Sequence, residues 1–76
     1  MNRDLATILT GDLKLSEQDL IPGATLEDAG VDSLAIVELS ILLGERLGLD
    51  VSEADIKGAA TLDQLDQLIQ RKRNER

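Results

Sequence analysis

Residues 30–48 read G-V-D-S-L-A-I-V-E-L-S-I-L-L-G-E-R-L-G and carry the strongest helical signal in the chain. Apolar residues recur at helical spacing from Leu34 to Leu47 and cover most of the circumference of a helix. The clearly polar positions are few: Glu38, Ser40, Glu45 and Arg46. Helices commonly end at a glycine such as Gly48, and a helix that is apolar on so many sides is usually buried. The pattern therefore predicts that the helix over residues 33–47 is the central and most buried one.

Three further helical signals flank this segment, and no stretch has the pattern of a strand. The first signal covers residues 2–10 and is followed by Gly11 and Asp12, which are expected to weaken or end that helix. The other two follow residue 48, a short one and then a longer one. The residues placed to cap these three helices are Asn2, then Ser52 with Asp55, then Thr61 with Gln64. The chain is therefore expected to be all-α, a four-helix bundle of three longer helices and one short helix.

A long loop, residues 12–32, connects the first and second helices. Pro22 and Gly30 within it are typical turn residues. Apolar residues are spaced along the loop, which indicates that it lies on the core: Leu13, Leu15, Leu20, Ile21, Leu26 and Val31. Ser16 and Thr25 each begin a capping pattern and each predict a single helical turn.

The length of 76 residues allows one small domain. We expect that domain over residues 1–70 and a polar, basic tail over residues 71–76, which either extends the last helix or frays. Cys, His and all aromatic residues are absent, so the core must be aliphatic. We expect the core to contain Leu26, Val37, Leu39, Leu43, Ile56, Leu62, Leu65 and Leu68. Val31 and Leu34 are expected to anchor the loop and the start of the second helix.

The net charge of −7 is concentrated in residues 17–70, which hold twelve acidic and two basic residues. This balance argues against nucleic acid, whose phosphates require Lys and Arg. It indicates either partners with basic docking patches or simply a soluble surface. No apolar run is long enough to span a membrane, and the first residues do not resemble a signal peptide, so a cytoplasmic location is expected.

Ser33 stands where the long loop meets the most apolar helix, and two interpretations of it remain open. A serine at a helix start commonly caps the helix. The same position also favours a bound anion, because free N–H groups point toward it. Catalysis by Ser33 is not supported, since there is no His and neither Lys14 nor Lys57 is marked as a base. A calcium loop starting at Asp28 fails at its key positions, and no other metal site is indicated.

The residues around Ser33 resemble those of the acyl carrier proteins. The similar parts are T-L-E-D-A-G-V-D-S-L at residues 25–34, V-E-L at 37–39 and A-T-L-D-Q-L at 60–65. The resemblance extends over nearly the whole chain, from Leu5 to Ile69. It implies a bundle of three long helices and one short one, with no catalytic activity of its own.

The resemblance also implies a cofactor and partners. A phosphopantetheinyl transferase moves 4′-phosphopantetheine from coenzyme A onto the matching serine, here Ser33, and the thiol of this arm carries acyl groups as thioesters. Enzymes of the acyltransferase and ketosynthase types, with basic docking patches, then bind the helix that begins at this serine. Carried onto this chain, the docking residues are Asp32, Leu34, Glu38, Ile41 and Glu45.

Some positions depart from the family pattern. Ala35 and Gly44 stand where fatty-acid carriers often have acids, which makes the docking surface more apolar. We therefore expect a free-standing, monomeric acyl or polyketide carrier, with fatty-acid biosynthesis as the neighbouring possibility. A peptidyl or amino-acyl carrier of a specialised pathway remains open. So does a helical interaction module without a prosthetic group, which would bind a partner helix through Leu34 and Ile41.

Overall fold

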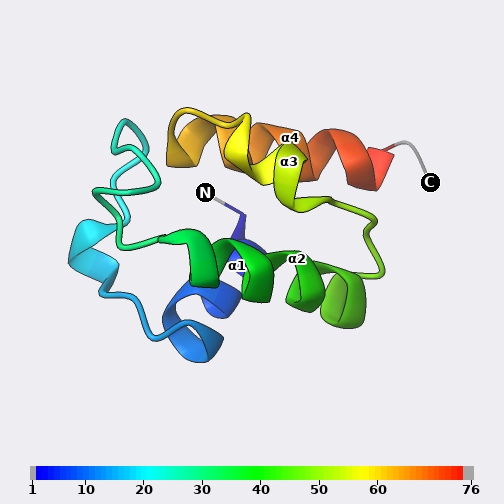
Figure 1. The fold of residues 1–76 in the computed structure, drawn as a ribbon, viewed down its shortest axis with the longest axis horizontal. Helices are drawn as coiled ribbons and strands as arrows, with labels where there is room; N and C mark the ends of the chain where they lie inside the picture. The colour runs from blue at the N-terminus through cyan, green and yellow to red at the C-terminus, as the bar shows by residue number, and fades with distance from the viewer. Residues whose placement is uncertain (1, 75–76) are drawn as a thin grey trace.

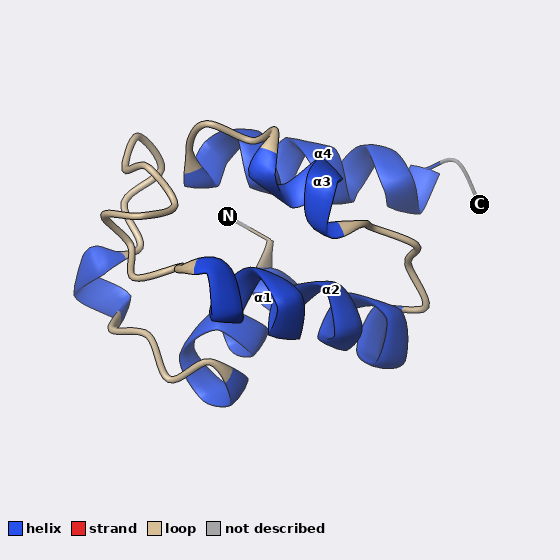
Figure 2. Cartoon of the chain, in the orientation of Figure 1, coloured by secondary structure: helices blue, strands red, loops and turns tan. Residues whose placement is uncertain are grey.

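The computed structural model describes residues 2–74 and shows an all-α bundle (Figure 1). Its elements in chain order are α1 (Arg3–Thr7), η1 (Ile8–Asp12), η2 (Glu17–Asp19), α2 (Ser33–Leu47), α3 (Glu53–Lys57) and α4 (Leu62–Asn74). The only strand-like feature within residues 2–74 is an isolated bridge between Thr25 and Thr61. Figure 2 shows α2 and α4 in two layers, with the long loop at the left end and the short α2–α3 connection at the right end in that view. The predicted fold class is confirmed.

The first helix starts where the sequence predicts and extends further. The side-chain oxygen of Asn2 accepts hydrogen bonds from the N–H groups of Asp4 at 2.8 Å and Leu5 at 3.4 Å. After α1 the helix widens into the π-helical turn η1, in which the Leu13 N–H donates to the Ile8 carbonyl. The helical stretch ends at Asp12, as expected, although Gly11 does not adopt the left-handed conformation of a glycine cap.

The long loop forms the two expected turns and lies on the core. Ser16 caps the 3₁₀ turn η2. Thr25 caps a second turn through its hydroxyl, which accepts from the Asp28 N–H at 3.0 Å. The loop also covers the start of α4, because the Ala24 and Pro22 carbonyls accept from the first N–H groups of that helix. The loop backbone thus satisfies donors that a helix end cannot satisfy internally.

Helix α2 ends at Gly48 as predicted, with a φ of 66°. It is not the most buried helix, however, because three of its 15 residues are buried against four of 13 in α4, so that prediction is wrong. Its buried residues are Ile36, Leu39 and Leu43, whereas Leu34 is 66% exposed and Ile41 is 53% exposed. The neighbouring elements cover one side of α2 and leave the other open, which also makes the prediction of Leu34 as an anchor wrong.

The core is aliphatic and draws on α1, η1, α2, α3 and α4. Most of the predicted core residues are buried: Leu26, Val31, Leu39, Leu43, Ile56, Leu62 and Leu65. Val37 and Leu68 are only half-buried, because they lie at the edges of their helices' inner faces. The remaining large buried side chains are Leu5, Ile8, Leu9, Ile36, Leu49, Val51 and Ile69.

Helices α3 and α4 begin at the predicted caps. The Ser52 hydroxyl and the Asp55 carboxylate form a reciprocal capping box. The pKa of Asp55 lies below its ordinary value of 3.8. The largest cause is the hydrogen bond with the Ser52 backbone N–H, and the hydrogen bond with the Ser52 hydroxyl is the second. The contribution of this carboxylate to stability is therefore present at neutral pH and is lost as the pH falls through its lowered pKa. At the start of α4 the Thr61 hydroxyl accepts from the Gln64 N–H, as predicted. The reciprocal bond of this capping box is shifted by one residue, because the Gln64 side chain accepts from the Ala60 N–H rather than from the Thr61 N–H.

Helix α4 continues through Arg71–Arg73 to Asn74, so this part of the basic tail extends the helix. Residues 75–76 of the tail, and Met1, lie outside the described residues. Two of the three cations of the last turn reach other helices: Lys72 lies 3.9 Å from Asp55 of α3 and Arg73 lies 3.1 Å from Asp4 of α1. Exposed ion pairs of this kind contribute little individually, on the order of 0–1 kcal/mol.

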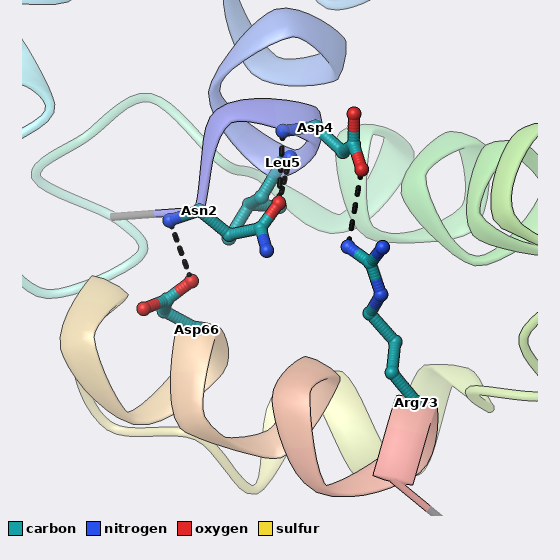
Figure 3. A network of polar contacts seen from close by, with 5 residues as sticks. All are labelled: Asn2, Asp4, Leu5, Asp66 and Arg73. Carbon is teal, nitrogen blue, oxygen red and sulfur yellow. Dashed lines mark hydrogen bonds and ion pairs between the residues drawn. The ribbon is translucent and has the colours of Figure 1, made fainter. Parts of the chain in front are cut away.

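One polar network joins the two ends of the chain (Figure 3). The Asn2 N–H donates to Asp66 Oδ1 at 2.9 Å, and the Gln70 amide donates to Asp66 Oδ2 at 2.9 Å. Asp66 is 8% exposed and is the one buried charged residue among residues 2–74. Both carboxylate oxygens are therefore satisfied, as a buried charge requires.

We predict that Asp66→Ala lowers the free energy of unfolding by about 1–3 kcal/mol, because it leaves the Asn2 N–H without its partner. Asp63→Ala is the matched control, since Asp63 accepts from Gln67 with the same four-residue spacing but at the exposed side of α4. The control should lose less than about 1 kcal/mol. Urea denaturation measures both, and equal losses would contradict the role of the buried network.

Candidate functional site

The N-cap of α2 is Asp32 and not Ser33. The Asp32 carboxylate accepts from the Ala35 N–H at 2.8 Å, and the Asp32 carbonyl accepts from the Ile36 N–H at 2.9 Å. Ser33 is thus the first residue inside the helix. The interpretation of Ser33 as a structural cap is wrong, since the aspartate before it performs that task.

The Ser33 hydroxyl is exposed and has no hydrogen-bond partner within residues 2–74. The three other serines of the chain all use their hydroxyls in the fold. Ser16 and Ser52 cap helical turns, and Ser40 donates to the Val51 carbonyl at 2.7 Å. Ser33 is therefore the one serine whose oxygen can be changed chemically without the loss of a structural hydrogen bond.

The turn before α2 fixes the position of Ser33. Gly30 has a φ of +97°, in the region that residues with a Cβ rarely adopt. A Cβ at this position would also lie 3.1 Å from Leu15 Cδ2. The next residue, Val31, is buried, and its N–H donates to the Leu26 carbonyl at 2.8 Å. The chain is thus anchored two residues before the serine and turns outward from that anchor.

A shallow open depression of about 430 Å³ lies beside Ser33. Its lining residues are Glu27, Gly30, Val31, Asp32, Ser33 and Ile36. Val31 and Ile36 are buried and form an apolar floor, while Glu27 and Asp32 are exposed acids. No basic residue lines the depression, so nothing in it neutralises a bound anion except the N–H groups at the start of α2.

The expected docking residues lie on the open side of α2. Leu34, Glu38, Ile41 and Glu45 are all exposed and follow one another at intervals of four, three and four residues. This spacing places them along one side of the helix. Asp32, also exposed, stands at the start of the same helix. The structure thus brings the five residues together on one accessible surface.

Two contacts of the site were not anticipated from the sequence. The first is the cap by Asp32, for which a signal existed, because Asp and Ser are about equally good N-caps. The second is the close approach of Leu15 to Gly30, such that a Cβ on Gly30 would lie 3.1 Å from Leu15 Cδ2; this approach joins distant parts of the loop and has no local signal. Within residues 2–74, no group of three potential metal ligands is found, and no helix is long and apolar enough to cross a membrane.

Comparison with known proteins gives a consistent result. Residues 3–69 match the family model described as "Phosphopantetheine attachment site". The acyl carrier protein of Desulforapulum autotrophicum is 36% identical over 56 residues, which cover 72% of this chain and 73% of that protein. The acyl carrier protein of Chlamydia trachomatis serovar D is 29% identical over 72 residues, or 93% of this chain and 94% of that protein. No solved structure gives a significant match.

We predict that Gly30→Ala destabilises the protein by about 1–3 kcal/mol, because it combines a strained φ with a close contact to Leu15. Gly23→Ala is the matched control in the same loop, where a Cβ would meet no atom within 4 Å. The control should change the free energy of unfolding by less than about 1 kcal/mol. Equal stability of the two variants in urea would show that Gly30 does not hold the turn.

Proposed function

The chain belongs to the acyl carrier protein family, whose members carry 4′-phosphopantetheine and have no catalytic activity of their own, and from this premise we propose that Ser33 is the attachment residue. The observation that carries this assignment is the free, exposed hydroxyl of Ser33 among serines that are otherwise committed to the fold. A phosphopantetheinyl transferase needs a serine oxygen that is accessible and that makes no structural hydrogen bond. Ser33 meets both conditions.

The start of α2 also fits the phosphodiester of the arm. The N–H groups of Ser33 and Leu34 have no acceptor within residues 2–74, and they point out of the helix end. Such groups, together with the helix dipole, favour an anion without a basic side chain. Asp32 opposes this effect with its charge, but its carboxylate is held by the Ala35 N–H.

The arm supplies a thiol that carries the acyl group as a thioester. The chain has no cysteine to compete for that acyl group.

Partner enzymes dock, in this proposal, on the exposed side of α2 through Asp32, Leu34, Glu38, Ile41 and Glu45. The two apolar side chains would supply contact area, and the acids would attract a basic patch on the partner. The expected partners are the phosphopantetheinyl transferase and enzymes of the acyltransferase and ketosynthase types. A contiguous patch of exposed apolar side chains commonly marks an interaction surface.

The proposal extends to the pathway. Ala35 and Gly44 leave α2 with fewer acids than a fatty-acid carrier usually has, which favours a free-standing, monomeric acyl or polyketide carrier in the cytoplasm. A specialised surface of this kind would restrict the set of enzymes that the carrier serves. The acyl group itself is determined by those enzymes.

We predict that Ser33→Ala abolishes the mass gain seen when the protein is incubated with coenzyme A and a broad-specificity phosphopantetheinyl transferase. The free energy of unfolding should stay within about 0.5 kcal/mol of the wild type, because no structural hydrogen bond is lost. Ser16→Ala is the control, which should still gain the mass of one arm. A Ser33→Ala variant that gains this mass would overturn the assignment.

We predict that Glu38→Lys and Glu45→Lys each slow acyl transfer to a condensing enzyme with a basic patch by about tenfold at low salt. The difference from the wild type should shrink as salt is added, because screening weakens the attraction. Glu17→Lys in η2 makes the same charge change away from α2 and should have little effect. An equal decrease in all three variants would mean that net charge, and not this surface, guides docking.

A further inference from the structure

Helices α3 and α4 lie side by side (Figure 1), and an open groove of about 580 Å³ runs between them. One wall is formed by α3 and the glycine that ends it, and the other wall by α4. The residues that give the groove its character are Ala54, Asp55 and Gly58 on the first wall and Gln64, Gln67 and Arg71 on the second. No residue of α2 lines this groove, so it is separate from the proposed attachment site.

Two glutamine side chains of the groove each keep one hydrogen-bonding atom unused. Gln64 Oε1 accepts from the Ala60 N–H at 3.0 Å, which leaves Gln64 Nε2 as a donor without an acceptor within residues 2–74. Gln67 Nε2 donates to Asp63 Oδ2 at 3.0 Å, which leaves Gln67 Oε1 as an acceptor without a donor in the same part of the chain. The partners also fix how each amide is turned, because an N–H only donates and an ionised carboxylate only accepts. One free donor and one free acceptor are what a peptide main chain requires.

Arg71 adds a positive charge to one end of the groove. The last turn of α4 has three cations, of which two form ion pairs with other helices. The Arg71 side chain has no partner within residues 2–74. The acid of the groove, Asp55, is offset by Lys72 at 3.9 Å. Because a guanidinium binds a carboxylate through two parallel N–H donors, this end of the groove favours a carboxylate.

The three polar groups form a row along α4. Gln64, Gln67 and Arg71 are spaced by three and four residues, so they share one face of the helix and extend over about 10 Å. An extended chain covers that distance with about three residues. On the other wall, Ala54 and Gly58 have at most one side-chain carbon, which lets a main chain approach closely. The groove therefore matches about three residues of extended main chain with a negative charge at the Arg71 end.

An ion pair crosses the Arg71 end of the groove. Lys72 of α4 and Asp55 of α3 join the two helices directly beside Arg71. A chain that ends at Arg71 does not have to pass this pair, whereas a chain that continues does. This arrangement favours the carboxylate at the end of a chain over an acidic side chain within one.

We propose that the α3–α4 groove binds the C-terminal residues of a partner protein as an extended chain, with the terminal carboxylate on Arg71. A peptide carbonyl of this tail accepts from Gln64, and a peptide N–H donates to Gln67. Recognition is therefore by main chain and carboxylate, with little demand on the side chains of the tail. The groove selects the charge opposite to the one that the acids of α2 attract. The inference goes beyond the proposed function, and the binding it describes does not need an arm on Ser33.

The test titrates the ¹⁵N-labelled protein with N-acetyl-trialanine bearing a free C-terminal carboxylate and follows the amide shifts by NMR. Residues 54–58 and 64–71 should shift, with a Kd on the order of 1 mM. The same peptide with a C-terminal amide should bind about fivefold more weakly, because Arg71 loses its anion. N-methylation of the backbone amides of the peptide should also weaken binding about fivefold, because Gln67 loses its donor.

The matched variants are Arg71→Gln and Lys57→Gln. Arg71→Gln should bind the carboxylate peptide no better than the amide peptide. Lys57→Gln removes the same charge from the last turn of α3, outside the groove, and should bind both peptides like the wild type. Both positions are exposed and have no ion pair within residues 2–74, so neither variant should change the melting temperature by more than about 3 °C.

Four results would overturn the inference. One is equal binding of the carboxylate and amide peptides, and another is an Arg71→Gln variant that still discriminates between them. The third is a shift of the same groove residues when the arm is attached to Ser33 without peptide, since the groove would then hold the arm. The fourth is a dimer in sedimentation that Arg71→Gln abolishes, since the groove would then bind a second copy. Failure of the proposed function is distinguishable, because a missing mass gain at Ser33 leaves peptide binding unchanged.

Discussion

The hydrogen bond from the Ala35 N–H to the Asp32 carboxylate determines how this protein presents its functional residue. A helix must satisfy the N–H groups of its first turn, and a serine or aspartate can do so about equally well. Because Asp32 takes this role, α2 begins with Ser33 inside the helix and the serine hydroxyl stays free. The same polar oxygen could not both cap the helix and carry a covalent arm without a cost to the fold.

The rest of the molecule holds this helix start in place. Gly30 turns the chain, Val31 fixes it in the core, and the carbonyls of Pro22 and Ala24 bind the loop to the beginning of α4. A domain of this size has a thin core, so it depends on such local bonds more than a large domain does. One side of α2 is consequently left without cover, and that side carries the acids and the exposed apolar side chains proposed to meet partner enzymes.

Much of this fold was predictable from the sequence because its signals are local. Capping residues and apolar spacing act within one or two turns, so the four helices, the caps at Asn2 and Ser52 and the two turns of the loop were anticipated. Apolar spacing alone does not say whether a side chain meets the core or a partner, so α2 was expected to be buried although Leu34 and Ile41 are exposed. The bond between Asn2 and Asp66 joins residues 64 positions apart and has no local signal. The family resemblance indicated Ser33, whereas only the structure shows that its hydroxyl is free of structural bonds.

The most direct test of this account is amide hydrogen exchange at Ala35, measured by NMR before and after phosphopantetheine is attached. If Asp32 caps α2, the Ala35 N–H is protected by a carboxylate that the modification does not touch. Its protection is therefore expected to persist when the arm is present. Loss of that protection on attachment would show that the Ser33 oxygen had been serving as the cap, and it would contradict the separation of structural and functional roles between these two neighbouring residues.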